Sequence, residues 1–491
     1  MINIGTKAIR KQKNFWSNCL FHPTDAIEDP WGKRILDQMS ADGAIRTVRI
    51  YAMLEDIVYA AHDGSIAYDF RLNDLRLDYL IEKGYDLLIA YAGMPNEIAA
   101  STQNLTSVSK NKTRYKGKMF NTSPPKDYAL WEEVCYEYTR HLIERYGIDT
   151  VSGWRLQCFN EPDIPAFFMS ELPDGQDAER AEAYCKMYEG FTLGISRASE
   201  KLNRGGPALA YRREFLGMLL DYVKEHKLKL DFISLHNYGV TPDELNSGTK
   251  RISVANNLKK HEDYMQTIRA HGYGNTEIII DEWGAATAGF FNKEECPALI
   301  FRETEVFSAY YAKLIHSLVY SDYNIDKLII CLSGQHEMTE DFSGFRNFFT
   351  LNFIKKPIYN AFVLASRLGE NLLECENSEE NVHVIPTETE NGSYAVLLSY
   401  SDEHFTEDIP KKEVTVHFEG VTAALQAEIT RIDKTAANPF RLWESMGITA
   451  SNEKEIALLR AEGEMKPQSI AVTNGDASLT LTPNCTYLIT L

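Results

Sequence analysis

The alternation of short apolar runs with longer amphipathic stretches is the feature that most limits what this chain can fold into. From about residue 15 to 365 it repeats eight times, with strand-like runs at 15–20, 46–52, 86–93, 152–161, 208–213, 231–239, 277–284 and 327–334. Such a pattern is typical of βα units around a parallel sheet. We therefore predict an α/β fold, a (β/α)8 TIM barrel over residues 13–365.

Amphipathic stretches between the runs predict helices of this barrel, among them 29–43, 72–84 and 129–147. In the last of these, apolar residues recur at spacings of three and four, which places them on one helix face. They are Trp131, Val134, Cys135, Tyr138, Leu142 and Tyr146. A doubly wound sheet is the competing architecture, but it should carry a glycine-rich phosphate turn after its first strand, and no GxGxxG motif occurs there.

After about residue 370 the apolar pattern changes to a period of two. Short runs separated by turn residues lie at 381–388, 393–400, 413–420, 427–433 and 477–491. A period of two indicates antiparallel strands with one buried face. We therefore expect a C-terminal antiparallel β-sandwich over 366–491, which an N-terminal strand within 1–12 could join.

The charge balance argues against two classes of partner. The chain carries a net charge of −19, which repels the phosphate backbone of nucleic acids and anionic membrane surfaces. No apolar run approaches the length of a membrane span. The basic segment Lys110–Lys118 departs from this balance. It has two interpretations, a solvated loop or a contact with an acidic substrate.

The cysteines are scattered, at positions 19, 135, 158, 185, 296, 331, 375 and 485, without a close pair of the CxxC type. This is not the density of a disulfide scaffold, so we expect reduced thiols in the core. The N-terminal segment is basic but lacks the apolar stretch of a signal peptide. The sequence therefore predicts a cytoplasmic protein and leaves open whether it forms a homo-oligomer.

Two glutamates stand at or near the ends of predicted strands. Glu161 closes the fourth run, WRLQCFNE, and Glu282 lies in the seventh, EIIIDEWG. In a barrel of this type, catalytic groups sit at the carboxyl ends of the strands. Cleavage of a glycosidic bond with retention needs one carboxylic acid and one carboxylate about 5–5.5 Å apart. We expect the two strands, on opposite sides of the barrel, to bring both carboxyl groups into one cleft.

The segments around these glutamates resemble signatures of clan A glycoside hydrolases. FNEPD is similar to the clan's Asn-Glu-Pro motif, which implies that Glu161 is the acid/base and that Asn160 hydrogen-bonds the sugar 2-hydroxyl. DEWG is similar to the clan's nucleophile strand, which implies that Glu282 is the nucleophile and adds Trp283 to the site. The resemblance implies a retaining glycosidase that works by double displacement on an oligosaccharide or glycoside, without a cofactor.

Within the clan, the order of motifs most resembles family 39 of the glycoside hydrolases, the β-xylosidase and α-L-iduronidase family. FWSNCL, VRIY, DFISLHNYG and GFRNFFTLNFIKKPIYNAFVLASRLG follow one another in the family's order. By this match, His236 contacts substrate and the Tyr238 hydroxyl bonds the nucleophile. Arg49 corresponds to a clan arginine that holds the nucleophile side of the site.

Two further substrate-binding residues come with departures from the family pattern. Tyr51 stands where the family's β-xylosidases carry a histidine, and Glu337 aligns with a substrate-binding glutamate after strand 8. Those enzymes supply a tryptophan and a Glu-Glu pair from strand 8, whereas this chain reads LIICLSG and has Met338 after Glu337. The catalytic pair is untouched, but the glycone pocket is changed.

The resemblance therefore predicts β-D-xylosidase-like removal of terminal sugars from plant-type oligo- or polysaccharides. An α-L-arabinofuranosidase, an arabinobiose-releasing enzyme and an α-L-iduronidase on the same scaffold stay open as alternatives. A non-catalytic carbohydrate-binding barrel is the rival from another class: the changed strand 8 favours it, and the presence of both glutamates argues against it. A metal-dependent hydrolase is a weaker rival, because no HExxH motif or clustered His/Asp pattern occurs.

Overall fold

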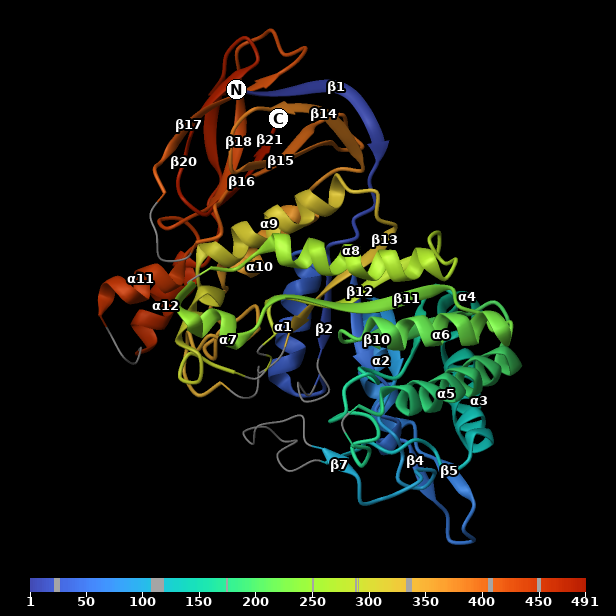
Figure 1. The fold of residues 1–491 in the computed structure, drawn as a ribbon. Helices are drawn as coiled ribbons and strands as arrows, with labels where there is room; N and C mark the ends of the chain where they lie inside the picture. Colours follow the sequence, from blue (N-terminus) through green and yellow to red (C-terminus); the bar gives the residue numbers. More distant parts are fainter. Residues whose placement is uncertain are drawn as a thin grey trace.

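The computed structural model of the chain describes residues 1–21, 27–106, 119–173, 175–249, 251–287, 289, 291–332, 338–404, 409–447 and 452–491. Within these residues, parallel strands close into an eight-stranded barrel in the order β10-β11-β12-β13-β2-β3-β6-β9 (Figure 1). The strands are β2 (Asn18–Phe21), β3 (Thr47–Tyr51), β6 (Asp86–Tyr91), β9 (Arg155–Cys158), β10 (Asn203–Leu209), β11 (Phe232–Val240), β12 (Glu277–Ala286) and β13 (Ile325–Leu332). The predicted barrel is confirmed.

A helix follows each barrel strand. In chain order these helices are α1 (Pro30–Ala41), α2 (Arg71–Glu82), α3 (Tyr128–Tyr146), α5 (Asp177–Ala198), α6 (Arg213–Glu225), α8 (Val254–Ala270), α9 (Glu305–Val319) and α10 (Pro357–Ser366). In α3 the predicted apolar face is buried from Trp131 to Leu142, and Tyr146 is partly buried. The amphipathic pattern therefore predicted the helix α3 and also which of its faces is buried.

Short elements occupy the loops of the barrel. They are the 3-10 turns η1 (Leu54–Asp56) and η3 (Pro297–Glu303), the π-turn η2 (Leu245–Thr249), and the helices α4 (Ile148–Val151) and α7 (Pro242–Glu244). Two small hairpins pair β4 (Val58–Ala60) with β5 (Ile66–Tyr68) and β7 (Leu105–Thr106) with β8 (Phe120–Asn121).

Two predicted strand positions are wrong in detail. The fifth strand was expected at 208–213, but β10 ends at Leu209, and Tyr211 lies beyond it with half of its surface exposed. The strand instead contains Gly205, where a Cβ would stand 2.2 Å from the Phe232 carbonyl oxygen of the neighbouring strand. The close approach of the two strands requires glycine at this position. Because glycine is depleted in strands, the sequence pattern does not predict a strand here. The fourth strand, β9, ends at Cys158 and not at Glu161.

In the part of the chain that the structure describes, the second sheet has nine strands in the order β19-β18-β21-β16-β15-β14-β1-β17-β20. They are β1 (Ile2–Lys11), β14 (Asn371–Asn377), β15 (Val382–Glu388), β16 (Tyr394–Tyr400), β17 (Lys412–Phe418), β18 (Leu425–Ile432), β19 (Gln468–Val472), β20 (Asp476–Leu481) and β21 (Cys485–Thr490). One apolar core contains residues from both halves of this order, so the sheet packs against itself as a sandwich. Strand β1 pairs antiparallel with β14 and parallel with β17.

The sheet and the barrel pack together. In Figure 1 the sheet, with both labelled chain ends, lies beyond α9 and α10, and α9 contacts β15, β16 and β21. Two helices of the C-terminal region, α11 (Pro439–Met446) and α12 (Glu453–Glu462), lie beside the barrel, and Arg441 of α11 pairs with buried Glu305 of α9. The boundary at 365/366 falls in the last turn of α10 and, as a domain boundary, stays a prediction.

All eight cysteines are free thiols, and only Cys375 is partly exposed. Among the described residues, no helix is both long and apolar enough to cross a membrane.

Candidate active site

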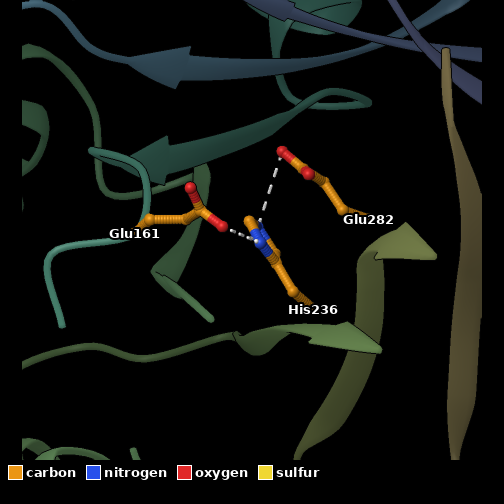
Figure 2. Close-up of side chains that lie close together, drawn as sticks. All are labelled: Glu161, His236 and Glu282. Atoms are coloured by element: carbon orange, nitrogen blue, oxygen red, sulfur yellow. Dashed lines mark hydrogen bonds and ion pairs between the residues drawn. The ribbon is translucent and has the colours of Figure 1, made fainter. Parts of the chain in front are cut away.

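Glu161 and Glu282 lie together (Figure 2). A carboxylate oxygen of each and a ring nitrogen of His236 all lie within 4.8 Å of one another. Strands β9 and β12 are the fourth and seventh barrel strands in chain order, as predicted, and they stand three places apart around the barrel, one place short of directly opposite. The carboxyl groups meet because Glu161 extends from the loop after β9, whereas Glu282 lies within β12.

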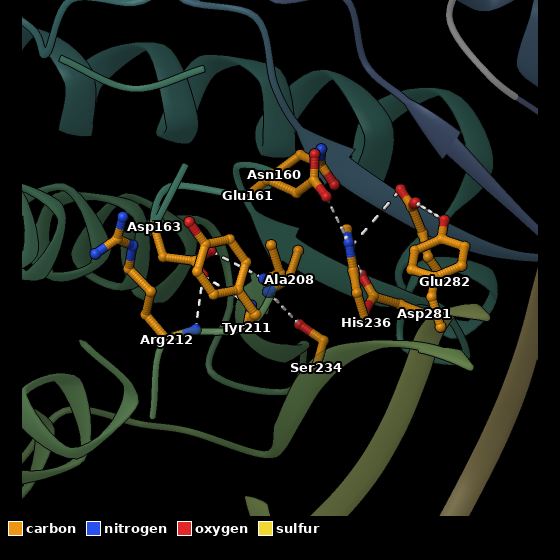
Figure 3. Close-up of polar contacts among 12 residues, drawn as sticks. Asn160, Glu161, Asp163, Ala208, Tyr211, Arg212, Ser234, His236, Asp281 and Glu282 are labelled. Carbon is orange, nitrogen blue, oxygen red and sulfur yellow. Dashed lines mark hydrogen bonds and ion pairs between the residues drawn. The ribbon is translucent and has the colours of Figure 1, made fainter. Parts of the chain in front are cut away.

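The loop that carries Glu161 is tied to the end of β10 (Figure 3). Glu161 has a left-handed backbone, with φ of 47°, and its N–H donates to the Ala208 carbonyl at 3.1 Å. Two residues later, buried Asp163 accepts three backbone hydrogen bonds, from the N–H groups of Ala210 at 2.9 Å, Tyr211 at 2.9 Å and Arg212 at 3.0 Å. These bonds fix the direction in which Glu161 points.

Glu282 is surrounded by hydrogen-bond donors. The Tyr238 hydroxyl donates to its Oε2 at 2.6 Å, while Arg49 Nη1 at 2.9 Å and the Tyr51 hydroxyl at 3.3 Å donate to its Oε1. Burial by itself raises the pKa of Glu282, but the charges of His236 and Arg49 and the Tyr238 bond outweigh it and hold the pKa well below its ordinary value. Glu282 is therefore a carboxylate, as a nucleophile must be.

Glu161 has the opposite electrostatics. Burial raises the pKa of Glu161, and the negative charge of Glu282 adds to this effect, although the hydrogen bond from His236 opposes it. The surroundings therefore shift the pKa values of the two carboxyl groups in opposite directions while the groups stand side by side. A protonated carboxylic acid next to an ionised one is the pairing that an acid and a nucleophile require.

His236 connects the two glutamates. Its ring is fully buried, with Nδ1 2.9 Å from Glu161 Oε1, and with Nε2 3.7 Å from both Glu282 Oε1 and Asp281 Oδ2. Burial lowers the pKa of His236, but the negative charges of Glu282 and Asp281 outweigh it and raise the pKa to about 10. His236 is therefore an imidazolium, so Nδ1–H donates to Glu161.

Arg49 ties the remaining inward side chains together. Its Nη2 donates to Asn160 Oδ1 at 2.7 Å and to Gln157 Oε1 at 2.8 Å, and it lies 3.0 Å from Asp281 Oδ2. Gln157 also donates to Asp281 Oδ2 at 2.7 Å. Asn160 remains partly exposed, whereas Arg49, Gln157 and Asp281 are fully buried. The arginine thus links the nucleophile to the residue before Glu161.

Sequence reasoning missed Asp163, Gln157, Asp281, Cys331 and Arg346. Cys331 of β13 contacts both Tyr238 and Glu282, and burial raises the pKa of its thiol. The Arg346 guanidinium lies 5.1 Å from the centre of the Tyr238 ring and is nearly buried. A signal was present for three of them, which stand without an assigned role in segments that resemble the clan or the family: Asp163 in FNEPD, Asp281 in DEWG and Arg346 in GFRNFF.

Among the site residues that the structure describes, one is not brought to the glutamates. Trp283 is fully buried on the other side of β12, stacked on Tyr311 of α9 with ring centres 5.7 Å apart. The predicted substrate contact of Trp283 is corrected, because side chains alternate along a strand and Glu282 takes the inner position. Glu337 and the basic segment Lys110–Lys118 lie outside the described residues.

Glu161, His236 and Glu282 are close enough together to be considered as metal ligands. An imidazolium has no lone pair to offer, however, and the pKa of His236 at about 10 keeps it protonated at neutral pH. We therefore do not assign a metal site to these residues. Their arrangement fits acid–base and nucleophilic chemistry.

Comparisons with known proteins identify a family and relatives to which the chain is similar. The model of a family described as glycosyl hydrolases family 39 matches residues 2–473. The chain is 25% identical to a beta-xylosidase of Caldicellulosiruptor saccharolyticus over 520 aligned positions, which cover 100% of this chain and 97% of that protein. It is also 25% identical to the alpha-L-iduronidase of Homo sapiens, over 48% of this chain and 35% of that protein.

The fold has solved counterparts. A monomeric beta-xylosidase from Caulobacter crescentus CB15 superposes with a TM-score of 0.81 at 19% identity, covering 100% of this chain and 98% of that one. A bacterial orthologue of human alpha-L-iduronidase superposes with a TM-score of 0.76 at 17% identity, covering 100% of this chain and 83% of that one. At these identities the superpositions show the shared architecture of barrel and sheet.

Proposed function

The chain belongs to glycosyl hydrolases family 39, and we propose that it is a retaining, β-D-xylosidase-like enzyme that removes terminal sugars from plant-type oligo- or polysaccharides. As a member of that family it is a glycoside hydrolase. The xylosidase-like activity is proposed because the relatives similar over most of the chain, from Caldicellulosiruptor saccharolyticus and Geobacillus stearothermophilus, are beta-xylosidases.

One observation carries the proposed mechanism. Oxygens of Glu161 and Glu282 lie within 4.8 Å of each other, and their surroundings favour opposite protonation states. Inverting glycosidases hold their carboxyl groups roughly 6.5–9.5 Å apart to leave room for a water molecule. The shorter separation supports a retaining enzyme, in which the carboxylate itself attacks the sugar.

In the first half of the proposed reaction, a Glu282 oxygen attacks the anomeric carbon. The bond from that carbon to the leaving oxygen breaks, and Glu161 gives its proton to the leaving oxygen. Arg49 and Tyr238 hold Glu282 in line, since each bonds a different oxygen of its carboxylate. The product of this half is a glycosyl ester on Glu282 and a free alcohol.

In the second half, water attacks the same carbon. Glu161, now ionised, takes a proton from the water, and the ester bond to Glu282 breaks with restoration of its carboxylate. The change of role follows from electrostatics: esterification removes the negative charge of Glu282, which had helped to raise the pKa of Glu161. His236 stays hydrogen-bonded to Glu161 and stabilises its ionised form in this half.

The side chains expected to contact the sugar surround this pair. Asn160 is partly exposed beside Glu161, and Tyr51 contacts Glu282 with its hydroxyl. We propose these two residues, with Glu337, as substrate contacts. The resemblance implies that His236 contacts the substrate. Because its ring is fully buried between the glutamates, we propose instead that it acts on the substrate through them.

One observation favours a second candidate, an α-L-iduronidase-type activity. Arg346 places a guanidinium beside the Tyr238 ring and close enough to help lower the pKa of Glu282. A cation there could pair with the carboxylate of a uronic acid. Hydrolysis of nitrophenyl β-D-xyloside, α-L-arabinofuranoside and α-L-iduronide under one set of conditions separates the xylosidase, arabinofuranosidase and iduronidase candidates.

We also propose that the enzyme works in the cytoplasm, since all eight cysteines are free thiols, which reducing compartments maintain. Whether it is a homo-oligomer is decided by light scattering during gel filtration.

The decisive test is covalent labelling. An activated 2-deoxy-2-fluoro-β-D-xyloside should inactivate the enzyme with a stoichiometry of one, and peptide mass spectrometry should place the sugar on Glu282. A non-catalytic carbohydrate-binding barrel would take up no label. Label on another residue would refute the nucleophile assignment.

A further inference from the structure

Asp281 stands directly before the nucleophile, yet both side chains face the interior of the barrel. A regular strand would point neighbouring residues to opposite faces. In β12, however, Leu235 pairs with Ile280 while His236 pairs with Glu282, so β12 has one more residue than β11. The pairing of β12 with β13 shows the same extra residue: Ile280 pairs with Leu328 and Trp283 pairs with Ile330, so three steps along β12 match two along β13. Asp281 is the extra residue of a β-bulge, a device that redirects side chains next to active sites.

The redirected carboxylate meets donors from three other strands. Asp281 Oδ2 lies 3.0 Å from Arg49 Nη2 of β3, 2.7 Å from Gln157 Nε2 of β9 and 3.7 Å from His236 Nε2 of β11. The Asp281 side chain is fully buried, so water does not screen its charge. Arg49 and His236 each contact Asp281 on one side and a catalytic glutamate on the other.

The charges of this group balance in the free enzyme. We define the buried cluster as Arg49, Glu161, His236, Asp281 and Glu282. In the proposed mechanism Glu161 holds its proton in the free enzyme, so two cations, Arg49 and His236, face two anions, Asp281 and Glu282. Without Asp281 the buried cluster would carry an excess positive charge, which is costly away from water.

The same balance holds in the intermediate of the proposed reaction. Glu282 loses its charge when it becomes an ester, and Glu161 becomes an anion when it gives its proton away. The buried cluster again contains two cations and two anions, with Asp281 as the anion that does not change. The proton and the negative charge move within a neutral group, so neither half of the reaction leaves an uncompensated buried charge.

We propose that Asp281 is a positioning residue that supplies the constant negative charge of the buried cluster, and thereby keeps Arg49 and protonated His236 against the two glutamates through both halves of the reaction. This inference rests on the proposed retaining mechanism. It extends that mechanism to a residue that does not touch the sugar and acts through Arg49 and His236.

Other charged or titratable groups also act on members of the buried cluster. They are Arg346, Lys260, Tyr238, Tyr51, Cys331, Asp163 and Tyr264. Burial raises the pKa values of the three tyrosines and of Cys331, so these four stay neutral over the working range. Arg346 is cationic, and Asp163 is held by three backbone N–H groups. Burial lowers the pKa of Lys260 to about 8, so Lys260 titrates in the wild type and in the Asp281 variants alike.

The test is the pH dependence of kcat/KM for Asp281→Asn, which keeps the shape and removes the charge. A nearby negative charge shifts a pKa upward by about 1–3 units. Its loss should therefore lower the proton affinity of the whole buried cluster and move both the acid and the alkaline limb of the profile to lower pH by at least about one unit. The value of kcat should fall more than tenfold with KM little changed.

A second variant restores the negative charge at Gln157, the residue that donates a hydrogen bond to Asp281 in the wild type. Gln157 contacts both Asp281 and Arg49, so the double variant D281N/Q157E returns one negative charge to the buried cluster. Both limbs should move back toward the wild-type positions. If D281N does not fold, Q157E alone adds a negative charge at the same place, and it should move both limbs to higher pH.

Asp433→Asn is the matched control. Asp433 is equally buried and accepts a hydrogen bond from Tyr487, but it lies directly after β18 of the second sheet, away from the glutamates. Its profile should keep the wild-type limbs. Limbs that stay in place in D281N, or that do not return in the double variant, would overturn the proposal for Asp281. Failure of the wild-type enzyme to take up the fluoro sugar would instead overturn the retaining mechanism.

Discussion

The hydrogen bond from Tyr238 to Glu282 is the best single place to test how the site sets its protonation states. The hydroxyl donates to Oε2 of the carboxylate at 2.6 Å, and Arg49 occupies the other oxygen. Substitution of Tyr238 by Phe removes the donor and keeps the ring. Because the bond exists for the ionised form, its loss must raise the pKa of Glu282 from its lowered position.

The size of the effect follows from the charge on the acceptor. A hydrogen bond to a charged group contributes roughly 1.5–3 kcal/mol, and one pKa unit corresponds to about 1.36 kcal/mol. Tyr238→Phe should therefore raise the pKa of Glu282 by about one to two units. Catalysis needs ionised Glu282, so activity should be lost at a higher pH when the solution is acidified.

The assay is kcat/KM for an aryl β-xyloside as a function of pH, which reports the free enzyme. The acid limb of Tyr238→Phe should lie about one to two units above that of the wild type, while the alkaline limb, set by Glu161, moves less. Tyr79→Phe is the matched control, since the Tyr79 hydroxyl also donates to a carboxylate at 2.6 Å, that of Asp37, away from the site. An acid limb that stays in place in Tyr238→Phe would refute the reasoning.

Three further predictions concern catalysis and stability. Glu282→Ala should abolish turnover. Glu161→Ala should slow the hydrolysis of natural substrates by roughly 10²–10⁴-fold and spare aryl glycosides with good leaving groups, because these leaving groups need little protonation. Equal loss of activity on both kinds of substrate in steady-state assays would contradict the acid role of Glu161. Asp163→Ala should cost at least about 2 kcal/mol in urea unfolding, because it leaves three backbone N–H groups without their acceptor, and it should lower kcat more than KM; unchanged stability and kcat would contradict this account. His316 of α9 and His383 of β15, whose rings lie 5.2 Å apart, have pKa values lowered by burial to about 4 and about 3. These pKa values are below that of a histidine in the unfolded chain, about 6.5. The stability linked to them is therefore fully present above about pH 6.5, and it is lost as the pH falls through the pKa values of the two histidines in the folded protein. Thermal unfolding of His383→Gln should show a smaller loss of Tm between about pH 7 and about pH 4 than the wild type, and an equal loss would refute the linkage.

The barrel could be predicted because most of its strands are intact apolar runs. The run at 277–284 contains three consecutive isoleucines and became the core of β12. The fifth strand could not be placed correctly, because its Gly-Gly-Pro sequence is unfavourable for a strand in isolation. What makes it a strand is the close approach of Phe232 on β11, and that contact is not visible in local sequence.

In the candidate site, too, some residues could be predicted from the sequence and others could not. Glu161 and Glu282 could be singled out because they lie in short motifs at or near the ends of apolar runs, where a barrel of this type carries its catalytic groups. Asp281 could not, since a residue next to an inward-facing side chain is expected to face outward. A bulge reverses that expectation, and it arises from pairing with both neighbouring strands. For Trp283 the motif suggested a sugar contact, but the alternation after the bulge turned it into the core.

The position of β1 between β14 and β17 has a consequence for biosynthesis. A ribosome makes this strand before any part of the barrel, but both of its partners emerge only after the barrel is complete. At about 5–20 residues per second, the strand waits on the order of half a minute for them. During that interval the apolar side chains of Ile2 and Ile4 are not covered by their partner strands. A fragment that starts after the barrel would lack β1, so β14 and β17 would each lose a hydrogen-bonded neighbour.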